Sequence, residues 1–363
     1  MLKYQLLLLW PFLLSQLSIP TSAQQLVKKN SYTFYLPKSS GFQPNASAVD
    51  LQRGEYLRTI SLPRPSLEIY NLNDGKLKQR IPVQAQKLGA FVRVSDDRLW
   101  IFDSYKRRYL FVDSSGTIIK AVDEMDKEYD GELAATYPDW QFNPLTFYDG
   151  RIYCVSALFI YDQKVEPRSS RFQNQGMVRV FDTRSNHVSW AATNTIKSLK
   201  HNFGYINRYS YARAKDHLVI SPAFSTELLV LNLKNNYHFY PDIKDTLYNE
   251  LIQPIASWKK YISLKDPAIL KHYYTNAQFV GIMYDHFRDR YYRFLILPKN
   301  RAGQHETKLI VLDKYLERLS THTIPMRYRL DGAFIDEHGL NLLDYDKYLN
   351  NYDQLVFDTL LFE

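Results

Sequence analysis

The amino-acid sequence predicts an all-β protein, a six-bladed β-propeller closed by strands from its two ends and carrying short helical insertions. Three observations support this fold class. A strand ending recurs six times, one unit shows all four strands of a blade, and the last unit lacks a strand that the N-terminal region can supply. Repeats of roughly 40 to 50 residues are typical of propeller blades.

The recurring strand ending consists of two large hydrophobic residues followed by Asp or Asn. Successive Asp or Asn positions are 42, 69, 50, 81 and 45 residues apart, so the shortest spacings match one four-stranded blade. The six endings are Ile69-Tyr70-Asn71, Phe111-Val112-Asp113, Val180-Phe181-Asp182, Val230-Leu231-Asn232, Val311-Leu312-Asp313 and Val356-Phe357-Asp358.

The clearest unit lies at residues 88–122. It predicts short strands beginning at Phe91, Arg98, Arg108 and Thr117, separated by turns rich in Asp, Ser and Gly. β-Branched and aromatic residues dominate the inner strands, as expected of a sheet covered on both faces.

The remaining units follow the same order with longer connections. The third pairs residues 150–155 with 177–182, the fourth places 216–220 before 227–234, and the fifth places 289–297 before 307–314. The first unit, 55–83, reads as only three strands, with a tight turn at Asn73-Asp74-Gly75.

The sixth unit runs from Gly332 to the C-terminus and contains strands at 339–343 and 354–361. It is one strand short, and we expect residues 31–36 to complete it, because ring closure removes an open sheet edge. Two insertions are expected, an acidic, Tyr-rich one near 123–143 and a helical one near 243–274. In the second, Leu247, Leu251, Ile252, Ile255 and Trp258 fall at helix-like spacing.

Residues 1–23 have the pattern of an export signal, with Lys3, an apolar stretch and small residues before a cleavage point after Ala23. The alternative is a retained membrane anchor, but Pro11 and Pro20 interrupt an already short apolar run. We therefore expect a mature single propeller domain, 24–363, that is exported to the periplasm or the extracellular space. Without a Cys at the cleavage point, it would not be lipid-anchored there, and no later segment is apolar enough to span a membrane.

Charge is mildly positive and dispersed, with 46 Lys and Arg against 38 Asp and Glu. Nucleic-acid-binding proteins usually concentrate basic residues on one face, so this pattern argues against a nucleic-acid partner. A solubilising surface is the favoured interpretation, and attraction to an anionic polysaccharide or outer-membrane surface is the second.

One segment resembles a known family. Tyr284-Asp285, Arg288-Asp289 and Tyr291-Tyr292-Arg293-Phe294 follow one another within residues 279–297. This order is similar to the hallmark blade of an uncharacterised family of exported six-bladed, TolB-like propellers, a domain of unknown function typical of Bacteroidetes. The terminal segments around Gly339 and 351–358 resemble that family's closing blade. The resemblance implies the fold and export, and it brings no catalytic residues.

The same segment supplies the candidate ligand-binding residues, because Tyr, His and Arg together offer flat stacking surfaces and fork-shaped donors for sugars, peptides or carboxylates. These candidates are Tyr284, Asp285, His286, Arg288, Tyr291 and Arg293. The alternative is structural: Tyr292 and Phe294 would fill the core between blades, and Asp285 and Arg293 would pair to hold a turn.

No catalytic constellation is identified, and neither a metal nor a cofactor is expected. The nine His residues show no paired helical spacing, and Cys154, the only Cys, lies in mid-strand, where we expect it buried. Three carboxylate pairs could in principle act on a glycan, but all three occur where turns are expected. They are Asp96-Asp97, Asp123-Glu124 and Asp336-Glu337.

The leading hypothesis is a non-catalytic extracytoplasmic propeller that binds a peptide, a glycan or an envelope protein on one face. The alternative is a glycan-active hydrolase or lyase with its site at the propeller channel, which carboxylates or His residues converging there would favour. A structural scaffold is a third possibility. Fold alone does not choose among these hypotheses.

Overall fold

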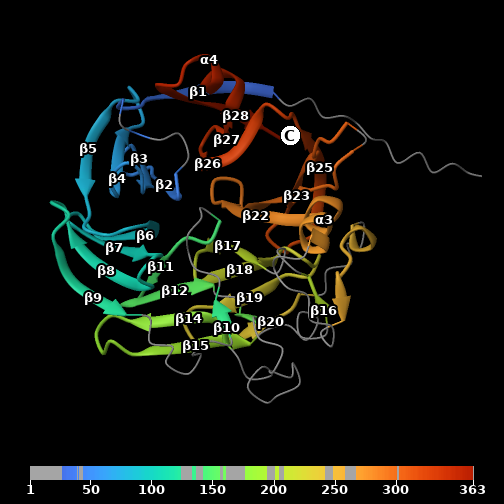
Figure 1. The fold of residues 1–363 in the computed structure, drawn as a ribbon, viewed down its shortest axis with the longest axis horizontal. Coiled ribbons are helices and arrows are strands. Elements are labelled where there is room, and N and C mark those ends of the chain that lie inside the picture. The colour runs from blue at the N-terminus through green and yellow to red at the C-terminus, as the bar shows by residue number, and fades with distance from the viewer. Residues whose placement is uncertain are drawn as a thin grey trace, which may run out of the picture.

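Six four-stranded antiparallel sheets stand radially around a central channel, as the computed structural model shows (Figure 1). The predicted six-bladed propeller is therefore confirmed. The structure describes residues 27–38, 40, 44–123, 133–135, 142–155, 158–160, 176–193, 201–203, 208–241, 248–257, 267–300 and 302–362. The predicted export signal lies outside these ranges.

Each blade begins with its innermost strand and proceeds outward. The first three blades consist of β2 (Ala46–Asp50), β3 (Glu55–Ile60), β4 (Ser66–Asn71) and β5 (Leu77–Pro82); β6 (Leu88–Ser95), β7 (Arg98–Asp103), β8 (Arg108–Asp113) and β9 (Ile118–Asp123); and β11 (Thr146–Tyr148), β12 (Arg151–Val155), β14 (Gly176–Asp182) and β15 (Val188–Thr193).

The next two blades and the closing blade follow the same plan. They consist of β17 (Tyr209–Ala214), β18 (His217–Pro222), β19 (Leu229–Asn232) and β20 (His238–Phe239); β22 (Gln278–Asp285), β23 (Arg290–Ile296), β24 (Thr307–Leu312) and β25 (Arg318–Ile324); and β26 (Tyr328–Asp336), β27 (Gly339–Asp344), β28 (Gln354–Leu361) and β1 (Val27–Tyr35).

The N-terminal strand completes the last blade, as predicted. β1 pairs antiparallel with β28 over its whole length, from Val27 opposite Leu361 to Tyr35 opposite Gln354. This pairing joins the two chain ends and satisfies the ladder hydrogen bonds of a strand that would otherwise be an open edge.

The recurring Asp or Asn has one role in five blades. Its side-chain oxygen accepts backbone N–H groups of the turn that leads to the outermost strand, which fixes a tight turn. The bonds run to Asn71 from residue 73, to Asp113 from residues 115 and 117, to Asp182 from residues 184 and 185, to Asn232 from residue 234, and to Asp313 from residues 315 and 317.

Asp358, the sixth member of the repeat, differs because its blade has no such turn. Its buried carboxylate accepts hydrogen bonds from Ser31 of β1 at 3.0 Å and from Tyr328 at 3.1 Å. The ammonium groups of Lys28 and Lys347 lie 2.9 and 3.0 Å away. Burial alone raises the pKa of Asp358, but the hydrogen bonds from Lys28, Lys347 and Ser31 outweigh it and bring the pKa to about 2.

Two turn glycines allow adjoining blades to touch through their backbones. A Cβ atom on Gly75 would lie 1.6 Å from the carbonyl oxygen of Thr33, and one on Gly116 would lie 1.8 Å from that of Pro82. Both glycines also have positive φ angles, of 67° and 88°. Only glycine meets both requirements.

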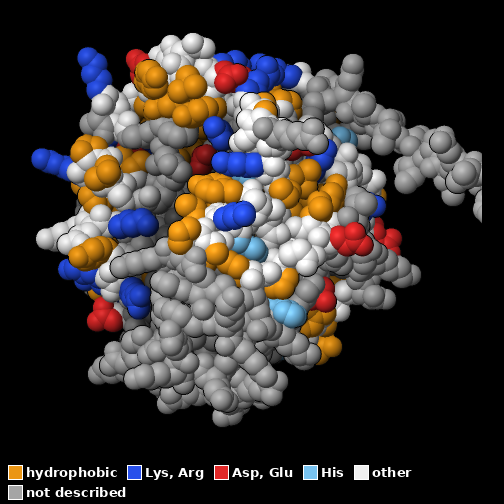
Figure 2. Space-filling model, turned by 45° about the vertical axis from the view of Figure 1, so that its right-hand side comes forward, with side chains coloured by type: hydrophobic (Ala, Val, Ile, Leu, Met, Phe, Trp, Pro, Cys, Tyr) orange, Lys and Arg blue, Asp and Glu red, His pale blue; other side chains and the backbone are white. Residues whose placement is uncertain are grey.

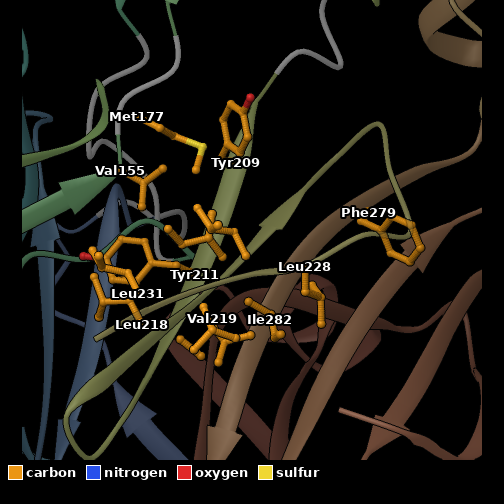
Figure 3. Close-up of a cluster of buried hydrophobic side chains, with 14 of the residues drawn as sticks. Val155, Met177, Tyr209, Tyr211, Leu218, Val219, Leu228, Leu231, Phe279 and Ile282 are labelled. Atoms are coloured by element: carbon orange, nitrogen blue, oxygen red, sulfur yellow. The ribbon is translucent and has the colours of Figure 1, made fainter. Parts of the chain in front are cut away.

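The core lies between blades rather than in one central layer. Figure 3 shows part of the largest cluster, in which side chains from the third, fourth and fifth blades meet, among them Val155, Met177, Tyr211, Leu218 and Ile282. Hydrophobic burial of this kind is the main favourable term in folding.

One sequence-based expectation was wrong, and another holds only for part of its range. The first blade has four strands rather than three, because β2 precedes the predicted unit. The helix expected near 243–274 is α3 (Pro267–Thr275), whereas residues 249–251 form the 3₁₀ turn η3 (Asn249–Leu251) and are followed by β21 (Ala256–Ser257). Leu247 and Trp258 lie outside the described residues.

Smaller elements occupy the connections at the end of the channel where the inner strands begin. β10 (Leu133–Ala135) pairs with β13 (Leu158–Ile160), and β16 (His201–Asn202) pairs with β21. A further helix, α4 (Tyr345–Asn350), links β27 to β28. Within the described ranges, no helix has the length and apolar character needed to cross a membrane.

Candidate functional site at the channel mouth

The candidate site lies at the end of the channel where the inner strands finish. There, residues at or just after the ends of β2, β17 and β22 surround a depression of about 950 Å³. We call this group the channel mouth; it consists of Gln52, Arg213, Lys215, Tyr284, His286 and Asp289.

Below the mouth, the channel holds a cavity of about 610 Å³ whose wall is mainly apolar. A cavity of this size suits a small ligand or the end of a larger one. Apolar side chains from all six blades contribute to this wall, including Val49, Leu57, Phe91, Val92, Leu145, Ala212, Ile282, Met283, Ala333, Phe334 and Ile335.

Phe142 forms the deep part of the apolar wall. Its ring packs on the backbone of Gly281, where a Cβ atom would lie 2.7 Å from it, and its centroid lies 5.6 Å from that of Phe294. Its carbonyl oxygen accepts a hydrogen bond from the backbone N–H of Tyr211 at 2.9 Å. Gly281 precedes Tyr284 by three residues on β22, so the ring lies roughly 10 Å below the mouth.

Arg213 provides a fixed positive charge at the mouth. Its guanidinium donates to the carbonyl oxygens of Lys215 and Phe147, both at 3.0 Å, and lies 5.5 Å from the ring centroid of Tyr148. All three partners are neutral groups, so the charge is positioned without being neutralised. Lys215, also exposed, forms no ion pair with any described residue.

Acidic residues on the opposite wall are already paired. Asp50 lies 3.2 Å from Arg53 and 3.0 Å from Arg93, and Arg93 also lies 2.8 Å from Glu55. This side of the channel is therefore close to neutral. The mouth also carries the Asp289 carboxylate, whose partner, the Tyr284 hydroxyl, is neutral, while the positive charge of the mouth lies on β17 and the turn that follows it.

Tyr284 and His286, two of the sequence-predicted candidates, line both the mouth and the cavity. The Tyr284 hydroxyl donates to Asp289 at 2.5 Å, and partial burial together with this bond raises the pKa of Tyr284 to about 12. The His286 ring is exposed and lies against Phe287, with 3.9 Å between centroids. Both side chains can therefore contact a ligand at the mouth.

Asp285 and Arg288 lie in the same turn, but their contacts are internal. The buried Asp285 carboxylate accepts backbone N–H groups of Phe287 and Arg288, the Arg288 guanidinium at 3.1 Å and the Tyr292 hydroxyl at 2.9 Å. Arg288 also donates to the carbonyl oxygen of Glu337 in the next blade. These bonds position the turn that carries His286.

Tyr291 and Arg293 lie away from the mouth. Tyr291 is buried against Tyr284, with 5.0 Å between their centroids. Arg293 points into the fourth blade, where it donates to the Ser221 hydroxyl at 2.8 Å and to the carbonyl oxygen of Ser225 at 2.6 Å. It joins two blades and is not the partner of Asp285.

Sequence reasoning missed Gln52, Arg213 and Lys215. A signal for Lys215 was present, since it follows the last residue of β17 just as His286 follows the last residue of β22. Aligning the ends of the inner strands would have placed both residues on the same rim.

Other candidate chemistry is absent from the described part of the chain. No group of three or more His, Cys, Asp or Glu residues could hold a metal ion there. Cys154 is buried, as expected, with its sulfur 3.0 Å from the Tyr109 hydroxyl. Asp96 and Asp97 are exposed in a turn, and Asp336 is buried, capping the turn before β27.

Basic side chains are scattered over the face seen in Figure 2, among hydrophobic and uncharged ones, with no continuous basic patch. On this face, the distribution of the described Lys and Arg side chains agrees with the dispersed charge of the sequence.

Comparison with known proteins places the chain in a family. A crystal structure of a DUF4221 family member from Bacteroides vulgatus has a TM-score of 0.72 at 16% identity, covering 93% of this chain and 98% of the other. A protein from Bacteroides fragilis, named for its expected export, has a TM-score of 0.54 at 10% identity, covering 94% and 97%. No curated protein matches the sequence. Residues 36–320 match DUF4221, a domain of unknown function, and the chain therefore belongs to the DUF4221 family.

Proposed function

We propose that this protein is an exported, non-catalytic binding propeller that takes its ligand at the channel mouth. The ligand would be a peptide, a glycan or part of an envelope protein. The observation that carries the proposal is the open, mainly apolar cavity of about 610 Å³ with a few polar groups gathered at one end, among them Arg213, Tyr284 and His286.

Export is part of this proposal. Residues 1–23 carry the pattern of a signal peptide, and export without a lipid anchor at the cleavage point follows from the absence of Cys there. The similarity to the B. fragilis protein supports the fold alone, so the destination depends on the sequence pattern.

Binding is favoured over glycan hydrolysis by the state of the carboxylates that border the cavity. Asp50 is held by two Arg side chains, and Asp289 accepts the Tyr284 hydroxyl. Both carboxylates are therefore already engaged by neighbouring side chains, whereas a glycan hydrolase needs a pair of carboxyl groups that face the scissile bond.

Capture from envelope extracts tests the proposal. Ala48 lines the cavity and is exposed, so its side chain faces the channel, and Ala48→Trp should fill the channel while leaving the packing between blades intact. Ala48→Ser is the matched control. Immobilised protein 24–363 should retain an envelope component, A48S should retain it equally, and A48W should lose it. Equal retention by A48W, no retention at all, or turnover of the captured component would refute the proposal.

A further inference from the structure

The channel combines two features that together define a ligand class. One is the apolar wall, which reaches from the mouth down to Phe142. The other is the positive charge of Arg213 and Lys215 at the rim. We propose that the channel binds an amphipathic monoanion, an unbranched alkyl carboxylate, with its carboxylate at the mouth and its chain along the apolar wall. This inference rests on the proposed function and specifies the ligand of the same site.

The head-group assignment follows from the arrangement of charges. Arg213 is held in place by carbonyl oxygens, so little conformational entropy is lost when it meets an anion. Lys215 follows in the same turn. The Asp50 carboxylate faces two Arg residues, whereas Asp289, whose partner Tyr284 is neutral, keeps its negative charge on the part of the rim that follows β22. An anionic group is therefore attracted to the side of the mouth formed by β17.

The tail assignment follows from the wall. Ile282 and Met283 lie on β22 between Gly281 and Tyr284, and residues 333–335 of β26 line the cavity beside them. Along these apolar residues a polar ligand would lose its hydration and gain few partners, whereas an alkyl chain gains by leaving water.

The depth of the channel limits the chain length. Phe142 lies roughly 10 Å below Tyr284. Each C–C bond of about 1.5 Å advances an extended chain by about 1.3 Å, so a chain of about eight carbons reaches the Phe142 ring. Octanoate is therefore the probe of choice, with hexanoate and decanoate as neighbours in the series.

Isothermal titration calorimetry of the protein with these three carboxylates and with octan-1-ol tests the inference. Affinity should rise at least tenfold from hexanoate to octanoate, since each buried methylene contributes about 0.8 kcal/mol. The rise from octanoate to decanoate should be smaller, because the longer chain extends beyond the depth of the channel. Octan-1-ol, which lacks the charge, should bind about tenfold more weakly than octanoate.

Variants separate the two halves of the site. R213Q/K215Q should weaken octanoate binding about tenfold and leave octan-1-ol binding unchanged. The control K76Q/K314Q also removes two exposed positive charges, from turns outside the mouth, and should have no effect. A48W should abolish binding of both ligands, and thermal melts identify any variant that fails to fold.

Three results would overturn the inference: no saturable binding of any alkyl carboxylate at millimolar concentration, equal affinity for octanoate and octan-1-ol, or octanoate binding that A48W leaves intact. Failure of the inference is distinguishable from failure of the proposed function. If A48W loses the envelope component while octanoate does not bind, the channel is a binding site for another ligand class.

Discussion

Asp358 offers the sharpest test of how the ring is held closed. We expect Asp358→Asn to weaken the attachment of β1, because the substitution removes the negative charge that faces Lys28 and Lys347 but keeps the size of the side chain. The pKa of Asp358 falls from its ordinary 3.8 to about 2. At about 1.4 kcal/mol per pH unit, this lowering corresponds to roughly 2 kcal/mol of folding free energy.

This value is an upper limit on the loss of folding free energy, because the two Lys side chains are 45% and 41% exposed and water screens their charges. A loss of about 1–2 kcal/mol is expected at pH 7. With an unfolding entropy of about 2.1 cal/mol/K per residue, that loss lowers the melting temperature by roughly 1.5–3 °C.

The sign of the pH dependence follows from the lowered pKa. The carboxylate of Asp358 stabilises the folded state fully above about pH 4, and this stabilisation is lost as the pH falls towards 2. At pH 2.5, about one third of the difference between wild type and D358N should remain. Urea denaturation at pH 7 and pH 2.5 measures both values.

The chain supplies its own control for this prediction. Asp313 occupies the same position of the repeat but only holds a turn, and Asn71 and Asn232 hold the equivalent turns in other blades. D313N should therefore cost less than about 0.5 kcal/mol. An equal loss for D313N and D358N, or a loss for D358N that does not change with pH, would refute the reasoning.

Three further substitutions test the packing. Gly281→Val should cost about 1–3 kcal/mol in urea denaturation, because its Cβ would lie 2.7 Å from the Phe142 ring. The double variant with Phe142→Ala should lose less than the sum of the two single losses, and full additivity would contradict this contact. Gly75→Ala should lower the melting temperature far more than Gly303→Ala. Both glycines have positive φ angles, but only at Gly75 would the added Cβ lie 1.6 Å from a backbone carbonyl oxygen. Equal shifts in melting temperature would contradict the importance of this close approach. Glu68→Gln should cost about 3–5 kcal/mol in urea denaturation, because it removes the negative charge that faces the fully buried Arg58 guanidinium at 2.9 Å. A loss below about 1 kcal/mol would show that this pair is not important.

The fold was predictable because each repeat contains a short sequence pattern that determines its own local structure. Asp or Asn after two hydrophobic residues marks a strand followed by a tight turn, and five such turns have the expected side-chain bonds. β2 escaped prediction because it is a short strand, Ala-Ser-Ala-Val-Asp, without large hydrophobic residues. Its side chains line the channel and need little bulk.

The helical insertion expected near 243–274 shows the limit of periodicity. Leu251 and Ile252 have helix-like spacing relative to their neighbours, yet they belong to a 3₁₀ turn and the segment after it. The helix of this connection begins instead at Pro267, a residue well suited to a first helical position. Short apolar patterns in long connections do not distinguish a helix from irregular packing.

The candidate site was only partly predictable, because the mouth is assembled from turns far apart in the sequence. Tyr284 and His286 belong to a conspicuous motif, whereas Gln52, Arg213 and Lys215 are inconspicuous until the ring brings them together. Arg293 illustrates the opposite case. It lies in the motif, but β23 directs its side chain into the neighbouring blade.

Joining the chain through its two ends has a kinetic consequence. The hydrogen bond between Ser31 and Asp358 spans 327 residues, so it belongs to the contacts of highest sequence separation in the molecule. Such contacts form late, since the entropy of closing a long loop is lost before they are gained. During synthesis, β1 is made first and has no partner strand until β28 follows near the other end of the chain. Proteases or chaperones therefore have access to this strand until the ring closes.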